Sequence, residues 1–245
     1  MDIESSLGLL SRLPKASSGT MMAAMLKVRQ RAPPAVPRGT SGGRAEYINY
    51  VVPGILLITV AAGAQGTAIS VAMDMTEGII ARFRTMAISR SAVLTGHVVG
   101  SLAQTMLGLT AVVGVALLIG FRPTAGLIQW IAAIGVLAMI TFALTWLSVA
   151  LGMVSKSVET ASNLPMPLML LPFLSSGFVP TDSMPAGMQW FAENQPFTAF
   201  NETLRGLLMG SPIGNSGLLT TAWCAAIAAG GYLWARGLYK RSSTR

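Results

Sequence analysis

DMTEGIIARFRTMAISR, residues 74–90, is the longest charged segment that lies between two long apolar runs. The run before it, 47–73, and the run after it, 91–121, contain no Asp, Glu, Lys or Arg. Charged side chains are costly inside the hydrocarbon of a bilayer, so a charged segment between two such runs is expected to face water. The pattern predicts a membrane protein in which residues 74–90 connect two spans.

The composition favours the same class. The chain has 245 residues, of which 52% are hydrophobic and 11% are charged, whereas soluble proteins carry about a quarter charged residues. Uncharged runs long enough to cross about 30 Å of hydrocarbon as a helix occupy 47–73, 91–121, 123–155, 160–181 and 206–235. None alternates like a barrel strand. We therefore expect an all-α, polytopic membrane protein with about five transmembrane helices.

The basic residues, which give a net charge of +8, indicate the orientation. Most of those beyond residue 46 fall on one side of the predicted spans: Arg82, Arg84, Arg90, Lys156, Arg236, Lys240, Arg241 and Arg245. Arg122 and Arg205 fall on the other side. The positive-inside rule places the more basic side in the cytoplasm. Because spans separate these residues and no aromatic residues interleave with them, no nucleic-acid partner is expected.

Residues 1–46 differ from the rest, since they are basic and rich in proline and glycine, and they predict a flexible segment. Residues 47–240 form the predicted membrane domain, and 241–245 a basic cytoplasmic tail. The positive charge of 1–46 conflicts with the predicted orientation, because this segment would begin outside. We expect either a five-span variant or a chain truncated or mis-started at its N-terminus, since a further span upstream would remove the conflict.

Within 74–90, the apolar residues Ile79, Ile80, Phe83 and Met86 are spaced to share one side of a helix. One interpretation is a helix that lies on the lipid headgroups. The other is a helix that docks in a groove on a soluble partner.

The predicted span 160–181 contains Pro165, Pro167, Pro172 and Pro180. Prolines free backbone carbonyls, which is tolerated where neighbouring helices or water satisfy them. The span faces either a pathway or dimer interface, or simply packs as a kinked helix. His97 is expected to be structural, because no acidic partner is evident in the spans.

A second informative stretch lies between Ser175 and Gly210. Trp190 and Phe191 belong to one short apolar piece, and Pro196 begins a second at the position that proline prefers in a helix. Phe197, Phe200, Leu204, Leu207 and Leu208 then follow helical spacing. These pieces predict two amphipathic helices that dip into the outer leaflet.

Catalytic motifs are missing from the sequence. There is no phosphate-binding GxxxxGK[ST] pattern, and a single histidine and a single cysteine, Cys224, cannot form a metal site. The chain is therefore expected not to be an enzyme by itself, and to carry no metal or cofactor of its own. Cys224 is expected to be a small packing residue.

Three local patterns together resemble the membrane subunits of type-2 ABC exporters, particularly the permeases of daunorubicin-type drug exporters. The first is Tyr47-Ile-Asn-Tyr-Val-Val-Pro53-Gly54, which is like the opening of that family's second span. The second is the acidic–glycine–basic order of 74–90, which is like its coupling helix. The third runs from Pro196-Phe-Thr198 to Leu204-Arg205, like its external segment. The resemblance covers residues 47–240.

The resemblance implies a permease that exports a hydrophobic or amphipathic drug, lipid or glycan from a bacterium, across the inner membrane. ATP and Mg²⁺ would bind a separate ABC ATP-binding subunit, and the permease would form a homodimer or heterodimer in the bilayer. The residues implied to couple to that subunit are Asp74, Glu77, Gly78, Ile80, Phe83, Arg84 and Arg90. Those implied to form an external re-entrant segment are Trp190, Phe191, Pro196, Phe197, Glu202 and Arg205.

The chain departs from the family where Ala87 replaces a common proline, where Gln195 separates Asn194 from Pro196, and in lacking the first of six spans. The alternatives are a non-transporting membrane anchor or assembly subunit, a truncated non-functional permease, and a secondary transporter.

Overall fold

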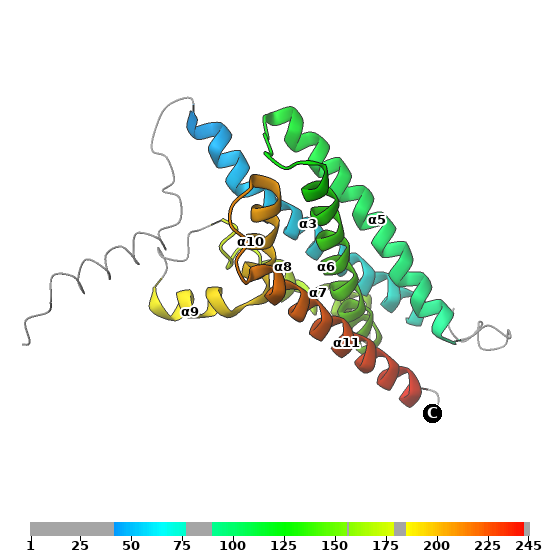
Figure 1. Ribbon diagram of the computed structural model, residues 1–245. Coiled ribbons are helices and arrows are strands. Elements are labelled where there is room, and N and C mark those ends of the chain that lie inside the picture. Colours follow the sequence, from blue (N-terminus) through cyan, green and yellow to red (C-terminus); the bar gives the residue numbers. More distant parts are fainter. Residues whose placement is uncertain (1–41, 77–89, 156, 179–184, 243–245) are drawn as a thin grey trace, which may run out of the picture. The chain divides into compact units, whose positions relative to one another are not determined.

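The computed structural model describes residues 42–76, 90–155, 157–178 and 185–242 (Figure 1). Its regular elements in these ranges are all helices. They are α3 (Gly42–Thr76), α5 (Arg90–Ile119), α6 (Leu127–Val154), α7 (Val158–Asn163), α8 (Met166–Leu170), α9 (Ala186–Asn194), α10 (Pro196–Met209) and α11 (Ser216–Ser242).

Four of the described helices are long and apolar enough to cross a membrane: the stretches Glu46–Thr76, Thr95–Ile119, Leu127–Val154 and Ser216–Leu238. They correspond to the predicted spans 47–73, 91–121, 123–155 and 206–235. The all-α, polytopic class is therefore confirmed. The division into 1–46, 47–240 and 241–245 stays a prediction, although α3 begins before its first boundary.

The predicted span at 160–181 differs from the other four. Its described part is not one helix but α7 and α8, of 6 and 5 residues, followed by turns up to Phe178. Pro165, Pro167 and Pro172 cause the breaks, since a proline inside a helix removes one backbone donor and clashes with the preceding turn. The prolines therefore divide the described part of this stretch into short pieces, where a single span with a kink was one expectation.

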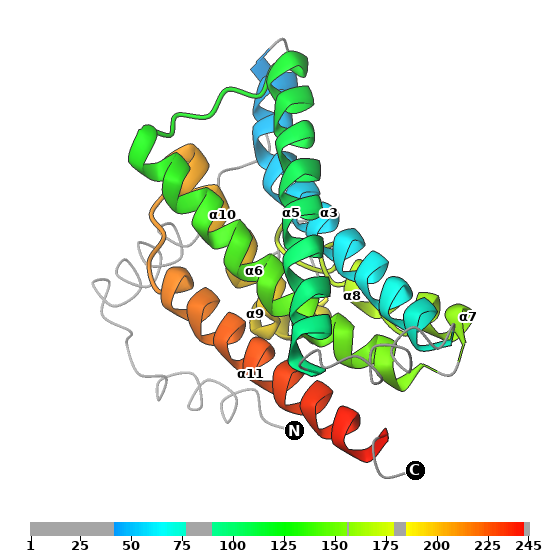
Figure 2. The ribbon, with the colours of Figure 1, turned by 90° about the vertical axis from the view of Figure 1, so that its right-hand side faces the viewer.

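The centre of the fold is α6, which packs against α3 on one side and α11 on the other (Figures 1 and 2). Glycines allow this close packing. A Cβ added to Gly152 of α6 would stand 2.6 Å from the backbone oxygen of Ala68 in α3, and one added to Gly231 of α11 would stand 2.6 Å from the backbone nitrogen of Leu147. Between membrane helices, such close approach supplies van der Waals contact that the hydrophobic effect cannot supply in lipid.

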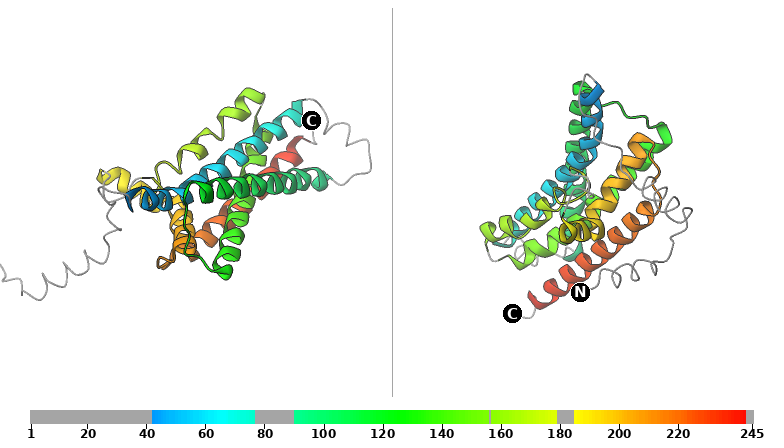
Figure 3. Two further views of the ribbon diagram at one scale, coloured as in Figure 1. Left: turned by 90° about the horizontal axis from the view of Figure 1, so that it is seen from above. Right: turned by 90° about the vertical axis from the view of Figure 1, so that its left-hand side faces the viewer.

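The helix ends gather in two places. The end of α3, the start of α5 and the ends of α6 and α11 lie at one end of the helical bundle, which we call the Asp74 end (Figures 2 and 3). The link between α5 and α6 lies at the opposite end, where the backbone amide of Thr124 donates to the carbonyl oxygen of Leu208 in α10 at 3.1 Å. This places Arg90 and Arg236 at the same end, as the charge pattern predicts.

Helix α5 is the least enclosed of the long helices. In the most apolar window of α3 half of the residues are buried, against 17% in α5. Most of α5 consequently presents its side chains away from the described helices. Cys224, in contrast, is buried in the main hydrophobic core, which agrees with its predicted packing role.

Candidate functional site

Of the residues predicted to couple to a partner, the structure describes Asp74 and Arg90, and both lie at the Asp74 end. Asp74 belongs to the last turn of α3, and Arg90 is the first residue of α5. Glu77, Gly78, Ile80, Phe83 and Arg84 lie outside the described residues. The helix ends that flank them are described, and these ends carry the geometry of the site.

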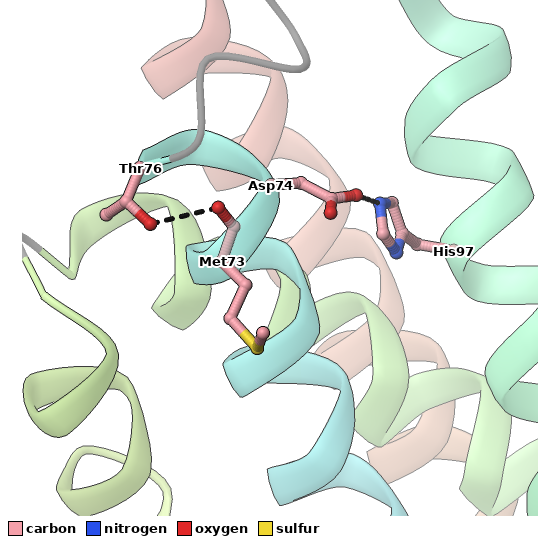
Figure 4. Close-up of polar contacts among 4 residues, drawn as sticks. All are labelled: Met73, Asp74, Thr76 and His97. Atoms are coloured by element: carbon pink, nitrogen blue, oxygen red, sulfur yellow. Dashed lines mark hydrogen bonds and ion pairs between the residues drawn. The ribbon is translucent and has the colours of Figure 1, made fainter.

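A histidine–carboxylate pair joins these two helix ends. Nε2 of His97, in the second turn of α5, lies 2.8 Å from Oδ2 of Asp74 (Figure 4). Both side chains are largely enclosed, with 18% and 28% of their surfaces exposed. The expectation that His97 has no acidic partner was wrong. The sequence assigned Asp74 to the charged connection, whereas α3 continues to Thr76 and turns the carboxylate toward α5.

Further from this end, small and hydroxyl-bearing residues bring α3 and α5 together. The hydroxyl groups of Thr67 and Ser101 are hydrogen-bonded at 2.6 Å. One turn beyond, Gly63 faces Thr105 so closely that a Cβ on Gly63 would lie 3.3 Å from the Cβ of Thr105. The two helices are thus joined by polar contacts at two heights and by a close approach at Gly63.

A groove of about 1000 Å³ follows this contact on its open side. We call it the polar groove. Its polar lining comes from Thr67, Ser70, Asp74, His97, Ser101 and Gln104, and glycines supply much of the rest. Polar side chains within membrane spans generally face a bundle interior or a water-filled path, because lipid cannot satisfy them.

Toward the opposite end, the same two helices line an apolar groove of about 480 Å³. Its walls include Tyr47, Val51, Ile55, Val112, Val115 and Ile119. The face shared by α3 and α5 is therefore polar near Asp74 and apolar at its other end.

The two helices predicted between Ser175 and Gly210 are present as α9 and α10. Pro196 is the first residue of α10, and Gly210, with φ of 70°, ends it in the left-handed conformation that glycine adopts readily. The apolar side of α10 is buried against other helices, with Phe197 and Phe200 1% and 0% exposed. Trp190 and Phe191 of α9 are instead exposed. Their insertion into the outer leaflet stays a prediction.

Arg205 lies at the centre of a polar cluster between α3, α10 and the turns after α8. Its Nη2 donates to the carbonyl oxygens of Ser176 at 3.1 Å and Tyr50 at 3.4 Å, and its guanidinium lies 4.1 Å from the centre of the Tyr50 ring. The Tyr50 hydroxyl also donates to the Ser176 carbonyl, at 3.0 Å. A cation over an aromatic face is attracted by the ring quadrupole. Arg205 therefore fastens α10 to the start of α3.

Glu202 lies elsewhere on α10 and accepts a hydrogen bond from the Ser216 hydroxyl at 2.6 Å, at the first residue of α11. The predicted external residues thus separate into three groups. Phe197 is in the core, Glu202 and Arg205 connect helices, and Trp190 and Phe191 are exposed.

Sequence reasoning missed the residues that complete these sites. Thr67, Ser101 and Gln104 stand inside apolar runs, and a polar residue in such a run is itself a signal of an enclosed path. Tyr50 entered the sequence analysis only as part of the pattern from Tyr47 to Gly54. Ser176 takes part through its backbone carbonyl, for which the sequence holds no signal.

The arrangement of α3 and α5 offers a groove that can bind a molecule, but few side chains that could catalyse the making or breaking of covalent bonds. Within the described ranges, no group of three or more His, Cys, Asp or Glu side chains is placed to hold a metal ion. Its distinctive features are a groove along two membrane helices and a polar bridge at the base of a charged connection.

Comparisons with known proteins agree with this geometry. Residues 16–209 match the family model described as ABC-2 type transporter. The chain is 30% identical over 168 residues to the daunorubicin resistance ABC transporter permease protein DrrB1 of Streptomyces coeruleorubidus, which covers 68% of this chain and 59% of that protein. It is 24% identical over 177 residues to the probable doxorubicin resistance ABC transporter permease protein DrrC of Mycobacterium tuberculosis, covering 72% and 64%. The matches thus span less than two thirds of either relative's length.

Proposed function

The chain belongs to the ABC-2 type transporter family, and on this basis we propose that it is the membrane permease subunit of an ATP-driven exporter in a bacterial inner membrane. Its cargo is a hydrophobic or amphipathic compound. ATP and Mg²⁺ are bound and used on a separate ABC ATP-binding subunit, so the chain itself is not an enzyme. The exporter contains two permease subunits, which are either two copies of this chain or this chain and a similar one.

The observation that carries the proposal is the polar groove on helices long enough to span a membrane. A helix that only anchors a complex has no use for Thr, Ser, Gln and Asp side chains along its length, because each is costly in lipid. An export path needs such groups, since it must hold water or cargo inside the membrane. The printed names of the relatives, which are resistance permeases, support the same function.

In the proposed mechanism, residues 77–89 dock on the ATP-binding subunit, in the manner of a helix in a groove. Closure of that subunit on ATP moves these residues, and they move the ends of α3 and α5 to which they are joined. The face between these helices then changes its width. Permeases of this kind alternate between two arrangements because packed interfaces switch rather than deform continuously.

The first test is to purify the full chain from its native membrane in mild detergent and to identify what accompanies it. An ABC ATP-binding subunit in comparable amount supports the proposal. ATP-dependent movement of a fluorescent amphipathic cation into inverted vesicles then tests export directly. A chain that carries the subunit but moves no cargo in any such assay would be an anchor, and the proposal would be wrong.

Docking through residues 77–89 has its own test. Replacing Phe83 or Glu77 with alanine is expected to uncouple ATP hydrolysis from transport, whereas Phe83→Leu, which keeps an apolar side chain, should preserve the coupling. Unchanged transport in both alanine variants at normal expression would refute this role.

The orientation is tested by two single cysteines in a Cys224→Ser background. Asn215 lies exposed in the turn before α11, and Gly237 is exposed near its end, with nothing within 4 Å of an added Cβ. On intact cells, a membrane-impermeant maleimide should label Asn215→Cys and not Gly237→Cys. The reverse labelling would place the Asp74 end outside.

A further inference from the structure

We propose that Asp74 and His97 form a positioning pair that holds the ends of α3 and α5 together, so that force on residues 77–89 reaches the polar groove. This inference rests on the proposed function, because it assumes that the connection between these helices is moved by an ATP-binding subunit. It adds His97 to the coupling machinery and gives Asp74, which the resemblance already places there, a defined role. Neither residue is proposed to touch ATP.

The position of the pair carries the first part of the argument. Asp74 lies in the last turn of α3, just before the chain leaves that helix, and His97 lies two turns into α5. Their contact of 2.8 Å therefore closes the chain upon itself at the base of the connection (Figure 4). A connection whose two ends are fastened transmits a push to both helices at once, whereas one with free ends lets each helix move separately.

The surroundings of the pair carry the second part. On the groove side of the pair the lining is small, since among the described residues nothing lies within 4 Å of a Cβ added to Gly96 or to Gly100. On the other side, Val71 of α3 and Val98 of α5 belong to one buried apolar cluster. Proceeding along α3, the hydroxyl bond between Thr67 and Ser101 follows, and seven residues of helix at about 1.5 Å each separate Thr67 from Asp74. The pair is therefore a polar contact that supplements the apolar packing between α3 and α5 at this end.

The groove supplies the third part. Asp74 and His97 line the polar groove as well as joining its two walls. A change in the distance between the helix ends consequently changes the width of the groove at the Asp74 end. In a low-dielectric environment a charge-assisted hydrogen bond is strong and directional, so it suits a contact that must survive repeated displacement.

The test uses the full transporter, with its ATP-binding subunit, in vesicles, and measures the cargo moved per ATP hydrolysed. Asp74→Ala and His97→Ala should each lower this ratio by about five-fold or more, while ATP hydrolysis continues near the wild-type rate. His97→Gln keeps a donor at the position of Nε2 and should retain most of the ratio. The exchanged pair, Asp74→His with His97→Asp, should recover much of what each alanine variant loses.

Val99, an exposed residue of α5 outside the groove, provides the matched control. Val99→Ala should leave the ratio unchanged. Unfolding temperatures in detergent identify variants that fail to fold. If an alanine variant fails, Asp74→Leu, which keeps a similar size and removes the acceptor oxygens, replaces it with the same expected loss.

Two negative results are distinguishable. If the wild-type assembly moves no cargo with ATP, the proposed function is wrong, and this inference is wrong with it. If the wild type exports cargo and the folded Asp74 and His97 variants keep its ratio, the pair is only structural, and the inference alone is overturned. A loss in the alanine variants that neither Gln nor the exchange restores would also overturn it.

Discussion

Gly231 of α11 stands so close to α6 that a Cβ added to it would lie 2.6 Å from the backbone nitrogen of Leu147 and 2.7 Å from the carbonyl carbon of Trp146. Real Cβ atoms do not approach a backbone this closely. The contact therefore requires glycine, and it fixes the separation of the two helices at the centre of the fold.

Gly231→Ala is expected to lower the free energy of unfolding by about 1–3 kcal/mol, because the two backbones must move apart and lose contact along their length. The neighbouring residue gives a matched control, since a Cβ on Gly230 would meet nothing within 4 Å. Gly230→Ala should leave stability the same or slightly higher, because alanine favours the helix. Unfolding temperatures in one detergent compare the two, and equal effects would contradict the packing.

The close approach of α3 to α5 predicts that a disulfide can be engineered between the two helices. The Cβ of residue 63 would lie 3.3 Å from that of Thr105, close to the about 3.5–4.5 Å found in disulfides. In a Cys224→Ser background, Gly63→Cys with Thr105→Cys should cross-link within one chain on mild oxidation, as detected by mass spectrometry of the joined peptides.

Gly66→Cys with Thr105→Cys is the control, because a Cβ on Gly66 has no neighbour within 4 Å. This pair should stay reduced within the chain. Cross-linking of both pairs to the same extent would show that α5 is not held in the position described.

Arg205 is expected to contribute stability through its carbonyl bonds and its contact with Tyr50. Arg205→Ala should lower the free energy of unfolding by about 2 kcal/mol, the usual range for hydrogen bonds of a charged group. Arg205→Lys should recover only part of this, since a lysine lacks the planar fork. Arg122, whose side chain is exposed, is the control, and Arg122→Ala should have a small effect. A comparable loss at both positions would mean that charge alone matters.

Two phenylalanines that share a sequence prediction should behave differently. Phe197 is 1% exposed and makes an edge contact with Phe200 at 5.6 Å between ring centres, whereas Phe191 is 44% exposed. Phe197→Ala should therefore cost about 3–5 kcal/mol of stability in detergent. Phe191→Ala should cost about 1 kcal/mol or less. The predicted insertion of Phe191 into the outer leaflet has a separate readout. If Phe191 inserts, Phe191→Ala will weaken the binding of lipid without changing the unfolding temperature in detergent.

Much of the fold could be predicted because long uncharged runs have few alternatives to a spanning helix. The start of α10 could also be predicted, since Pro196 prefers the first helical position and the following apolar residues repeat with a helical period. The helical period could not predict whether Phe197 contacts lipid or protein, because an apolar side chain is stable against either. The burial of Phe197 comes from α3, α6 and α11 packing around α10, which is a tertiary effect.

The errors have equally specific causes. The run 160–181 is uncharged throughout and long enough to span, and its prolines were expected to kink a helix, whereas they divide the described part into short pieces. The partner of His97 was missed because Asp74 was counted with the charged connection rather than with the helix before it. Because the predicted end of the first span was one turn too early, the contact between Asp74 of α3 and His97 of α5 was not foreseen. The residues between these helices are outside the described ranges, so their predicted docking role stays a prediction.

The glycine contacts of α6 also have an evolutionary consequence. At Gly152 and Gly231 the nearest neighbour is a backbone atom. A second substitution in the neighbouring helix cannot remove a backbone atom, so no other amino acid is expected to replace these glycines. The open side of α5 has no such restriction within the described part of the chain, since nothing there lies within 4 Å of a Cβ added to Gly96 or Gly100. Substitution is therefore expected to be restricted along the α3–α6–α11 packing and more readily accepted along α5, so that the sequence of α5 can change without loss of the fold.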